Sequence, residues 1–139
     1  MLKISKLVDH GALVLSNLPH KSTGFKSASY ISNETNLSLP NVSKILKLMH
    51  HGNLVYSVRG SKGGYALNKK PEEITAAEIL TALEGPIAIT ECIGEKSSCN
   101  VQNQCGMSYG WQRINNIISH ALNDITLRDL QEKPIKFTN

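Results

Sequence analysis

Residues 38–67, SLPNVSKILKLMHHGNLVYSVRGSKGGYAL, contain the pattern that decides the fold. Apolar residues in the first half recur at steps of three and four, which is typical of a helix with one buried face. Ser38 is placed to cap this helix, Pro40 falls in its first turn, and Gly52 can supply a left-handed cap at its end. The residues predicted to face inward are Val42, Ile45, Leu46 and Met49.

The second half of this stretch changes to a period of two around the glycine-rich turn RGSKGG. Alternation on both sides of such a turn predicts a two-stranded hairpin, with Arg59 and Lys62 at its tip. The alternating apolar positions are Leu54, Tyr56 and Val58 before the turn, and Tyr65 and Leu67 after it.

The residues before Ser38 predict a partner for its helix. Residues 4–18 repeat apolar side chains at helical spacing, and after a break at Pro19 and Gly24 a short helix capped by Ser27 follows. Two helices joined by a few residues, the second with a polar and basic free face, describe a helix-turn-helix. A basic hairpin directly after it predicts a winged helix, a mainly α fold with a small β-hairpin.

Two further helices are predicted downstream. The segment 75–84 opens with a capping box of Thr75 and Glu78 and ends at Gly85. From 107 to 123 apolar residues again recur at helical steps, in a band too broad to bury on a small winged-helix unit. We therefore expect this long helix to form the interface of a homodimer.

All three cysteines of the chain, Cys92, Cys99 and Cys105, lie in one glycine- and serine-rich segment between these helices. Clustered thiols in a reducing cytosol bind metal or do redox chemistry more often than they form disulfides. The C-x6-C-x5-C spacing is longer than the ligand pairs of most zinc sites, whereas iron–sulfur clusters are held mainly by thiolates. Incidental thiols and a zinc site stay open as alternatives at this point.

The composition narrows the class of protein. At 139 residues, with 40% hydrophobic and 19% charged residues, the chain is expected to form one domain with an appended arm. Its net charge of +4 is compatible with a polyanionic partner. We expect a cytoplasmic protein without membrane contact, because the apolar runs are short and the N-terminus is amphipathic. Without GxSxG, Walker or HExxH motifs, we expect neither an enzyme nor a small-molecule substrate.

The order of these motifs resembles the Rrf-type winged-helix transcription regulators. The similarity is carried, over about residues 1–130, by the N-terminal helix, SLPNVSKILKLM, VRGSKGGYAL, ALEGPIAITEC, the three spaced cysteines and WQRINNIISHALNDITLRDL. The family includes regulators of the IscR and NsrR kind, and the likeness is greatest to the regulator of the SUF iron–sulfur assembly system. It implies a homodimeric DNA-binding repressor whose affinity depends on a cluster held by the cysteine segment.

The same resemblance implies a ligand set. The three cysteines supply thiolates, and a cluster then needs a fourth ligand. In IscR-like members a histidine three residues after the last cysteine fills this role, but this chain has Ser108 there. In NsrR-like members an aspartate on the first helix of the other subunit completes the site. That position corresponds to Asp9 here, with His10 in reserve, and the cluster is expected to be [4Fe–4S] or [2Fe–2S].

The helix-turn-helix and the hairpin also carry the predicted contacts to double-stranded DNA. The first residues of a recognition helix face base edges in the major groove, where asparagine can bond adenine and lysine can approach guanine. Arg59 at the wing tip suits a narrow minor groove, and Lys47 and Lys62 suit phosphates. A dimer would read a pseudo-palindromic operator. The full predicted contact set is Ser38, Pro40, Asn41, Ser43, Lys44, Lys47, Arg59, Ser61 and Lys62.

We therefore expect four segments. They are a winged helix-turn-helix at 1–86, a cluster-binding segment at 87–106, a dimerisation helix with a short terminal helix at 107–131, and a tail at 132–139. The expected function is a regulator, most simply a repressor, of SUF iron–sulfur assembly genes that senses cluster status. A repressor that responds to nitric oxide or redox stress and a zinc-stapled winged-helix interaction protein are the alternatives.

Overall fold

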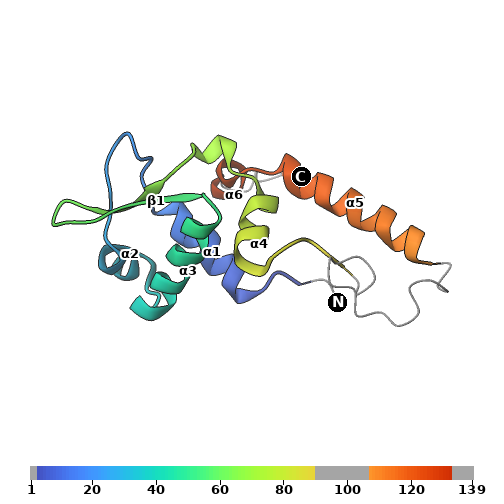
Figure 1. Cartoon of the computed structure of the whole chain (residues 1–139), viewed down its shortest axis with the longest axis horizontal. Coiled ribbons are helices and arrows are strands. Elements are labelled where there is room, and N and C mark those ends of the chain that lie inside the picture. The colour runs from blue at the N-terminus through green and yellow to red at the C-terminus, as the bar shows by residue number, and fades with distance from the viewer. Residues whose placement is uncertain (1–2, 90–106, 133–139) are drawn as a thin grey trace, which may run out of the picture.

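Helices and one antiparallel hairpin make up residues 3–89 and 107–132, the part of the chain that the computed structural model describes (Figure 1). The elements are α1 (Lys6–Ser16), α2 (Ala28–Thr35), α3 (Leu39–His51), β1 (Val55–Val58), β2 (Gly64–Leu67), the 3-10 helix η1 (Pro71–Glu73), α4 (Ala76–Glu84), α5 (Ser108–Asp124) and α6 (Leu127–Gln131). This order confirms the predicted mainly α fold, with a winged helix-turn-helix and a long C-terminal helix.

The core lies where α1, α3 and α4 meet. All four α3 residues predicted to face inward are fully buried there. Leu127 of α6 is also fully buried, so the C-terminal end of the described chain closes the same core. The largest buried side chains include Leu15, Ile31, Ile45, Leu46, Met49, Leu54, Leu67, Ile74 and Ile79.

After α5 the chain returns to the body of the molecule. The backbone N–H of Leu127 donates to the carbonyl oxygen of Ile74 at 2.7 Å. At the surface, Arg128 donates to the Glu72 carboxylate at 2.6 Å. A hydrogen bond from its own backbone N–H and the Arg128 contact lower the pKa of Glu72. These contacts anchor the C-terminal end of α5.

The predicted helix N-caps are present. The hydroxyls of Ser27 and Ser38 accept hydrogen bonds from backbone N–H groups in the first turns of α2 and α3. Thr75 and Glu78 form the predicted capping box at the start of α4. Local sequence therefore fixes where these three helices begin.

The predicted cap at the end of α3 is wrong. Gly52 has a φ of −82°, and the following Asn53 takes the left-handed conformation at 62°. Asparagine tolerates this conformation better than other residues with a side chain. Gly52 instead provides space, because a Cβ there would lie 2.8 Å from the Cβ of Ala82 on α4.

The hairpin forms as predicted, but its buried face differs from the alternating one. Tyr56 and Val58 are 45% and 39% exposed, whereas Val55, Ala66 and Leu67 are buried. The register pairs Leu67 with Val55 and Ala66 with Tyr56, so Leu67 lies on the face opposite Tyr56 and Val58. The outer half of the hairpin projects beyond the body (Figure 1). Alternation in the sequence therefore located the strands but not the covered face.

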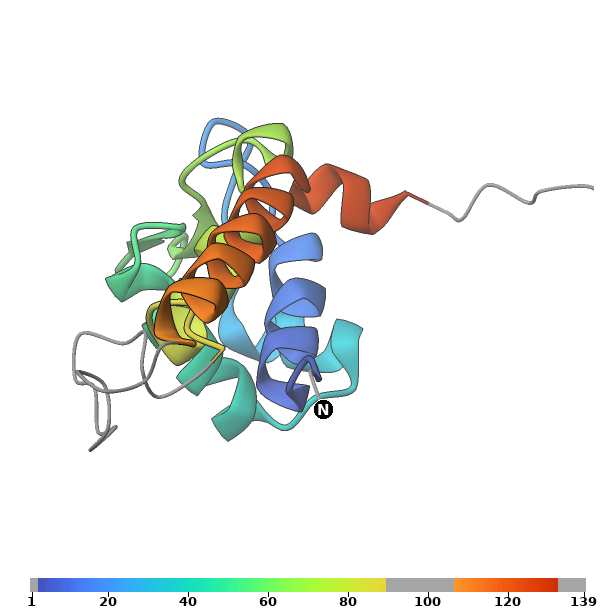
Figure 2. The ribbon, with the colours of Figure 1, turned by 90° about the vertical axis from the view of Figure 1, so that its right-hand side faces the viewer.

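Helix α5 projects from the body at the end opposite the hairpin (Figure 1). Seen from that end, it runs diagonally across α4, the helix that it contacts (Figure 2). Of its 17 residues only Asn115 is buried. In the described ranges no helix combines the length and the hydropathy that crossing a bilayer requires. The exposed large apolar side chains of α5 are Tyr109, Trp111, Ile114 and Ile117.

Candidate nucleic-acid interface

The first turns of α3 present polar side chains at the surface. Ser38 Oγ accepts a hydrogen bond from the backbone N–H of Asn41 at 3.3 Å, and Pro40 occupies the first turn, where no backbone donor is needed. One side of α3 is buried in the core. On the opposite side Ser43 and Lys44 are exposed, as is Lys47 one turn further on. The predicted major-groove residues therefore share the accessible side of one helix.

The turn between α2 and α3 is short and internally bonded. Asn36 takes a left-handed conformation with a φ of 57°, and the Ser32 hydroxyl donates to the carbonyl oxygen of Leu37 at 2.6 Å. α2 contacts α3, and its Ile31 is fully buried. These contacts fix the angle at which α2 supports α3, as a helix-turn-helix requires.

The loop between α1 and α2 braces the wing. His20 and Leu67 form a parallel bridge, and Lys26 and Tyr65 form an antiparallel one. The two backbone hydrogen bonds between Lys26 and Tyr65 measure 2.8 and 2.9 Å. The loop thus adds a third extended segment beside β2. Sequence reasoning missed this support because neither pair belongs to a local motif.

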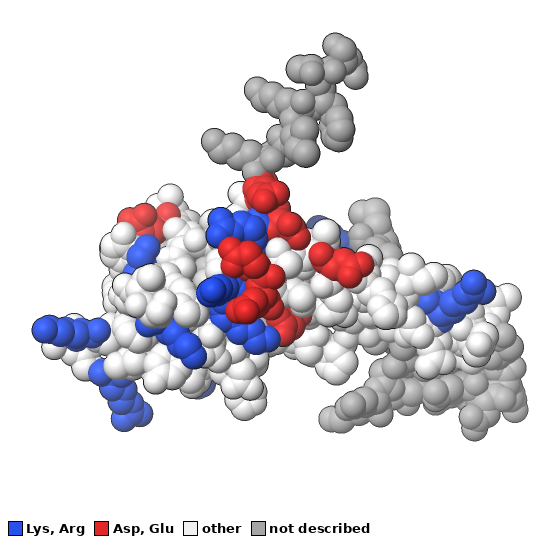
Figure 3. Space-filling view, turned by 90° about the horizontal axis from the view of Figure 1, so that it is seen from above, with Lys and Arg blue, Asp and Glu red and all other residues white. Residues whose placement is uncertain are grey.

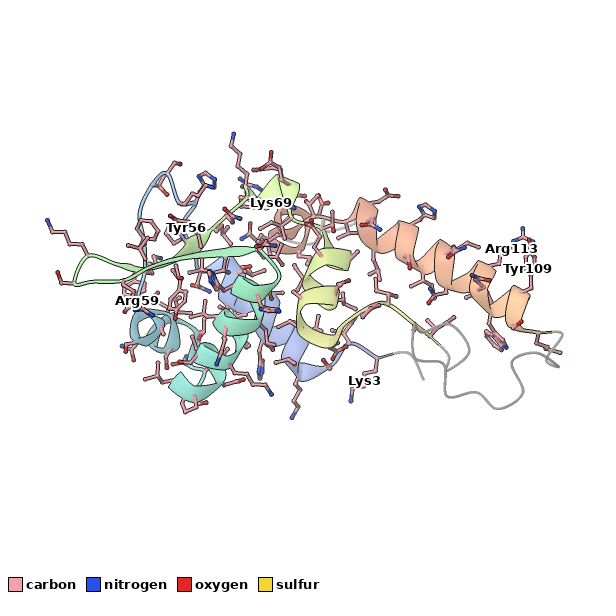
Figure 4. All side chains as sticks on the ribbon, viewed as in Figure 1. Lys3, Tyr56, Arg59, Lys69, Tyr109 and Arg113 are labelled. Atoms are coloured by element: carbon pink, nitrogen blue, oxygen red, sulfur yellow. The ribbon has the colours of Figure 1, made fainter. Side chains whose placement is uncertain are left out.

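The wing tip carries the remaining predicted contacts. Arg59, Ser61 and Lys62 are all exposed. In Figure 4, Arg59 and Tyr56 lie on the hairpin, at the end of the molecule away from Arg113 on α5. The side chains predicted to touch DNA and the long apolar helix are therefore well separated.

Two lysines beside the wing lie against tyrosine rings. The Nζ atom of Lys21 is 5.7 Å from the ring centroid of Tyr56, and that of Lys26 is 4.8 Å from the ring centroid of Tyr30. A cation–π contact of this kind orders a long side chain while its charge stays at the surface. Sequence reasoning did not single out either lysine, and Lys21 and Tyr56 are too far apart in the chain for local spacing to reveal them.

Charge is segregated along the chain. Residues 19–62, which include α2, α3 and the wing tip, carry a single acid, Glu34. Residues 71–84 carry four glutamates and no lysine or arginine. Seen from above, most of the visible acidic residues gather in the middle of the molecule, while basic ones lie beside them and towards both ends (Figure 3). The basic residues of 19–62 are Lys21, Lys26, Lys44, Lys47, Arg59 and Lys62.

The predicted cluster ligands fall only partly within the described residues. Cys92, Cys99 and Cys105 lie outside them. Asp9 is in the first turn of α1 and is exposed, as a ligand offered to another subunit must be. Among residues 3–89 and 107–132, no three His, Cys, Asp or Glu side chains come together to hold a metal ion.

Asn115 of α5 holds the segment that leads toward the cysteines. Its Oδ1 atom accepts a hydrogen bond from the backbone N–H of Ile89 at 3.1 Å, and its Nδ2 atom donates to the carbonyl oxygen of Ile87 at 3.2 Å. Asn115 is only 7% exposed. Sequence reasoning missed this role, because an asparagine inside a helical pattern gives no sign of being buried.

Asn115→Leu is expected to lower the free energy of unfolding by about 2–4 kcal/mol, since it leaves a partly buried N–H and C=O without partners. Urea unfolding followed by circular dichroism at fixed protein concentration measures the difference. Asn116→Leu, at an exposed position on the same helix, is the matched control and is expected to change stability by less than about 0.5 kcal/mol. Equal stability of the two variants would contradict the role of Asn115.

An apolar groove runs between α5 and the segment after α4. The α5 side chains that line this groove belong to the apolar band of that helix, which also includes the exposed Ile114. The groove and the band together form a continuous apolar surface. The apolar residues that line the groove include Leu80, Ile87, Ile89, Trp111, Ile118 and Leu122.

A helix-turn-helix that displays the polar side of its second helix, followed by a braced basic hairpin, defines a winged-helix protein of the DNA-binding class. The profile of the Rrf2 family, described as iron-dependent transcriptional regulator, matches residues 4–133. The chain belongs to this family of transcriptional regulators. The expectation that it is not an enzyme is thereby confirmed, since the relatives it matches are regulators.

Curated relatives include two regulators of the helix-turn-helix type. CymR of Bacillus subtilis is 31% identical over 130 residues, which cover 93% of this chain and 89% of CymR. IscR of Yersinia pestis is 32% identical over 111 residues, which cover 80% of this chain and 67% of IscR.

Two solved structures agree with this family. The structure of CymR, titled the global cysteine regulator of B. subtilis, matches with a TM-score of 0.69 and 32% identity and covers 94% of this chain and 96% of that one. The structure of T. potens IscR matches with a TM-score of 0.62 and 25% identity and covers 96% and 93%.

Proposed function

We propose that this chain forms a homodimeric repressor of SUF iron–sulfur assembly genes. The dimer binds its operator while the cysteine segment of the chain holds an iron–sulfur cluster. It acts in the cytoplasm on chromosomal DNA. The observation that supports DNA binding is that side chains in the first turns of α3 and at the wing tip are both exposed, and both lie in the most basic part of the chain.

Each of the four predicted segments has a part in this proposal. Residues 1–86 bind DNA, 87–106 hold the cluster, 107–131 form the dimer interface, and 132–139 are a tail. Within the first segment, the N-cap Ser38 and the α3 residues Pro40, Asn41, Ser43 and Lys44 meet base edges in the major groove. Arg59 and Ser61 of the wing reach the minor groove, and Lys47 and Lys62 meet phosphates.

Lys47→Gln is expected to weaken binding to every duplex by a similar factor, because a phosphate contact carries no sequence information. In a dimer the substitution removes two such contacts, so the slope of log affinity against log salt concentration falls by about 2. Fluorescence anisotropy at several salt concentrations measures this slope. Lys69→Gln removes the same charge, but Lys69 already bonds Glu78 at 2.6 Å, so this control is expected to keep the full slope. An unchanged slope in Lys47→Gln would place Lys47 away from DNA.

The dimer is supported by the apolar surface of α5. Nearly the whole helix is uncovered within one subunit, and its band continues into the groove beside Ile87. Exposed apolar patches of this extent mark interaction sites in soluble proteins. A second copy of the chain is the occupant we propose, because two such helices would bury each other and would place two winged units on a two-fold symmetric operator.

The cluster is supported by the chemistry of the donor set. Three thiolates, from Cys92, Cys99 and Cys105, with one exposed carboxylate, Asp9, match the ligands that iron–sulfur clusters accept. The description of the family as iron-dependent points the same way. When bound, a [4Fe–4S] or [2Fe–2S] cluster supplies a centre that iron supply and oxidants can alter, so that cluster loss relieves repression.

Asp9→Ala is expected to destabilise the cluster while leaving the fold intact, because the side chain is exposed. The anaerobic absorption spectrum, with iron and sulfide analysis, follows cluster retention over time in air. Glu34→Ala, another exposed acid on a different helix, serves as the control and is expected to match the wild type. If Asp9→Ala keeps its cluster as long as the control does, the fourth ligand is another residue, with His10 the next to test.

Two further candidates share the fold, and metal analysis separates only the second of them from the proposal. A repressor that responds to nitric oxide or redox stress would hold the same cluster and differ only in what the cluster reacts with. A winged-helix protein stapled by zinc would contain zinc without sulfide. Similarity to CymR, a cysteine regulator by its title, adds a third possibility, a regulator that is controlled by some other signal. The iron, sulfide and zinc contents of anaerobically purified protein distinguish a bound cluster from a zinc site and from a protein that holds neither.

A further inference from the structure

A contact between α1 and α3 links two side chains that lie 31 positions apart. The Nδ2 atom of Asn41 lies 3.2 Å from the Nδ1 atom of His10. Because an amide nitrogen can only donate, this hydrogen bond requires the tautomer of His10 that carries its proton on Nε2, so that Nδ1 accepts. Neither side chain is fully exposed.

The contact with His10 affects the orientation in which the Asn41 amide can meet a base. Asparagine recognises adenine through two hydrogen bonds, one accepted by Oδ1 and one donated by Nδ2. A free amide can turn over and exchange these two atoms, and only one orientation matches adenine. A lone pair on Nδ1 of His10 favours Nδ2 over Oδ1 at that place. Since Nδ2 carries two hydrogens, one bonds His10 while the other remains for the base.

The position of His10 is itself fixed by close packing of α1. The neighbouring Gly11 is buried, and a Cβ there would lie 2.5 Å from Leu83 Cδ1 on α4 and 3.0 Å from Met49 Cε on α3. Helix α1 therefore packs closely at Gly11 against side chains of both α4 and α3. A side chain on so rigid a support can hold another in one orientation.

We propose that His10 is a positioning residue for Asn41, which holds the amide in the orientation that reads adenine. This inference rests on the proposed function, because it requires that α3 enter the major groove. It adds a residue of α1 to the determinants of sequence preference, although His10 itself need not touch DNA.

Selection of duplexes from a random library, with the full-length dimer reconstituted anaerobically, tests this inference. Wild type is expected to prefer adenine at one position of each half-site by about 5- to 150-fold, the usual range for a bidentate contact. Asn41→Ala is expected to lose this preference. His10→Ala is expected to lower it by about 3- to 10-fold at the same position, and the double variant to match Asn41→Ala alone.

Two further variants separate positioning from general damage. His10→Gln, whose side-chain oxygen can accept the same hydrogen bond, is expected to restore most of the preference. His120→Ala, on the exposed surface of α5, is expected to select as wild type does. A structural defect would instead weaken binding at all positions alike.

The outcomes distinguish the two proposals. If His10→Ala keeps the full preference for adenine, the positioning role is wrong while the proposed function stands. If Asn41→Ala changes no position, the positioning role and the proposed base contact of Asn41 are both wrong, while operator binding by the dimer stands. If the wild-type dimer enriches no sequence at all, the proposed function fails first, and the role of His10 fails with it.

Discussion

Ile114→Asp in α5 is expected to dissociate the dimer and to lower affinity for a two-half-site operator by about 10²–10⁴-fold. Ile114 is 43% exposed in one subunit and lies within the apolar band that we propose as the interface. A carboxylate forced into that interface would lose its hydration without gaining a partner, a penalty of several kcal/mol. Without the partner, each winged unit binds its half-site alone and the gain from linked binding is lost.

Asn116→Asp is the matched control for this experiment. It adds the same charge two residues away, at an exposed position outside the apolar band. Sedimentation velocity gives the oligomeric state, circular dichroism confirms folding, and fluorescence anisotropy gives operator affinity. If Ile114→Asp remained dimeric and bound the operator as tightly as Asn116→Asp, a surface other than α5 would have to join the subunits.

Cys105→Ser is expected to remove the cluster and to bring operator affinity down to that of the cluster-free protein. Serine keeps the size of the side chain but replaces the thiolate with a much poorer ligand for iron. If cluster-loaded and cluster-free dimers differ about 100-fold in affinity, the underlying coupling free energy is about 3 kcal/mol. We therefore expect Cys105→Ser to lose that factor and the visible absorption together.

Ser98→Ala, in the same segment, controls for changes near the cysteines that remove no ligand. It is expected to retain iron, sulfide and full affinity. A colourless Cys105→Ser protein that still bound the operator as tightly as Ser98→Ala would separate the cluster from DNA binding. In that case the thiols would serve another purpose.

Local rules account for much of the fold. Ser38, Thr75 and Glu78 form caps because their side chains bond backbone groups within three residues, and sequence reports such short-range contacts well. Helical spacing similarly predicted which α3 residues are buried. The breadth of the apolar band on α5 also predicted a helix that one subunit leaves uncovered.

Contacts between distant segments could not be predicted in the same way. The brace that Lys26 forms with Tyr65 and the pair of His10 with Asn41 depend on how elements meet in space. Asn115 is similar, since its side chain is buried and its partners are backbone groups of a segment 26 and 28 residues away. In each case a polar residue gains its role from the tertiary fold, which periodicity and caps do not specify.

The errors have the same origin. Gly52 was expected to end α3 by its backbone freedom, but close approach of Ala82 uses its missing side chain instead. Period-two spacing located both strands, but their register, which pairs Leu67 with Val55, decides which residues share a face. Both outcomes depend on packing between elements.

A titration of the wild-type dimer on the SUF promoter, with and without its cluster, tests the central claim most directly. Protein reconstituted without oxygen and the same preparation stripped of iron are compared by anisotropy under identical salt. We predict that the cluster-loaded dimer binds about 100-fold more tightly, in proportion to its iron and sulfide content. Equal affinity of the two forms, or an iron-free protein that binds the promoter under the control of another signal, would contradict it.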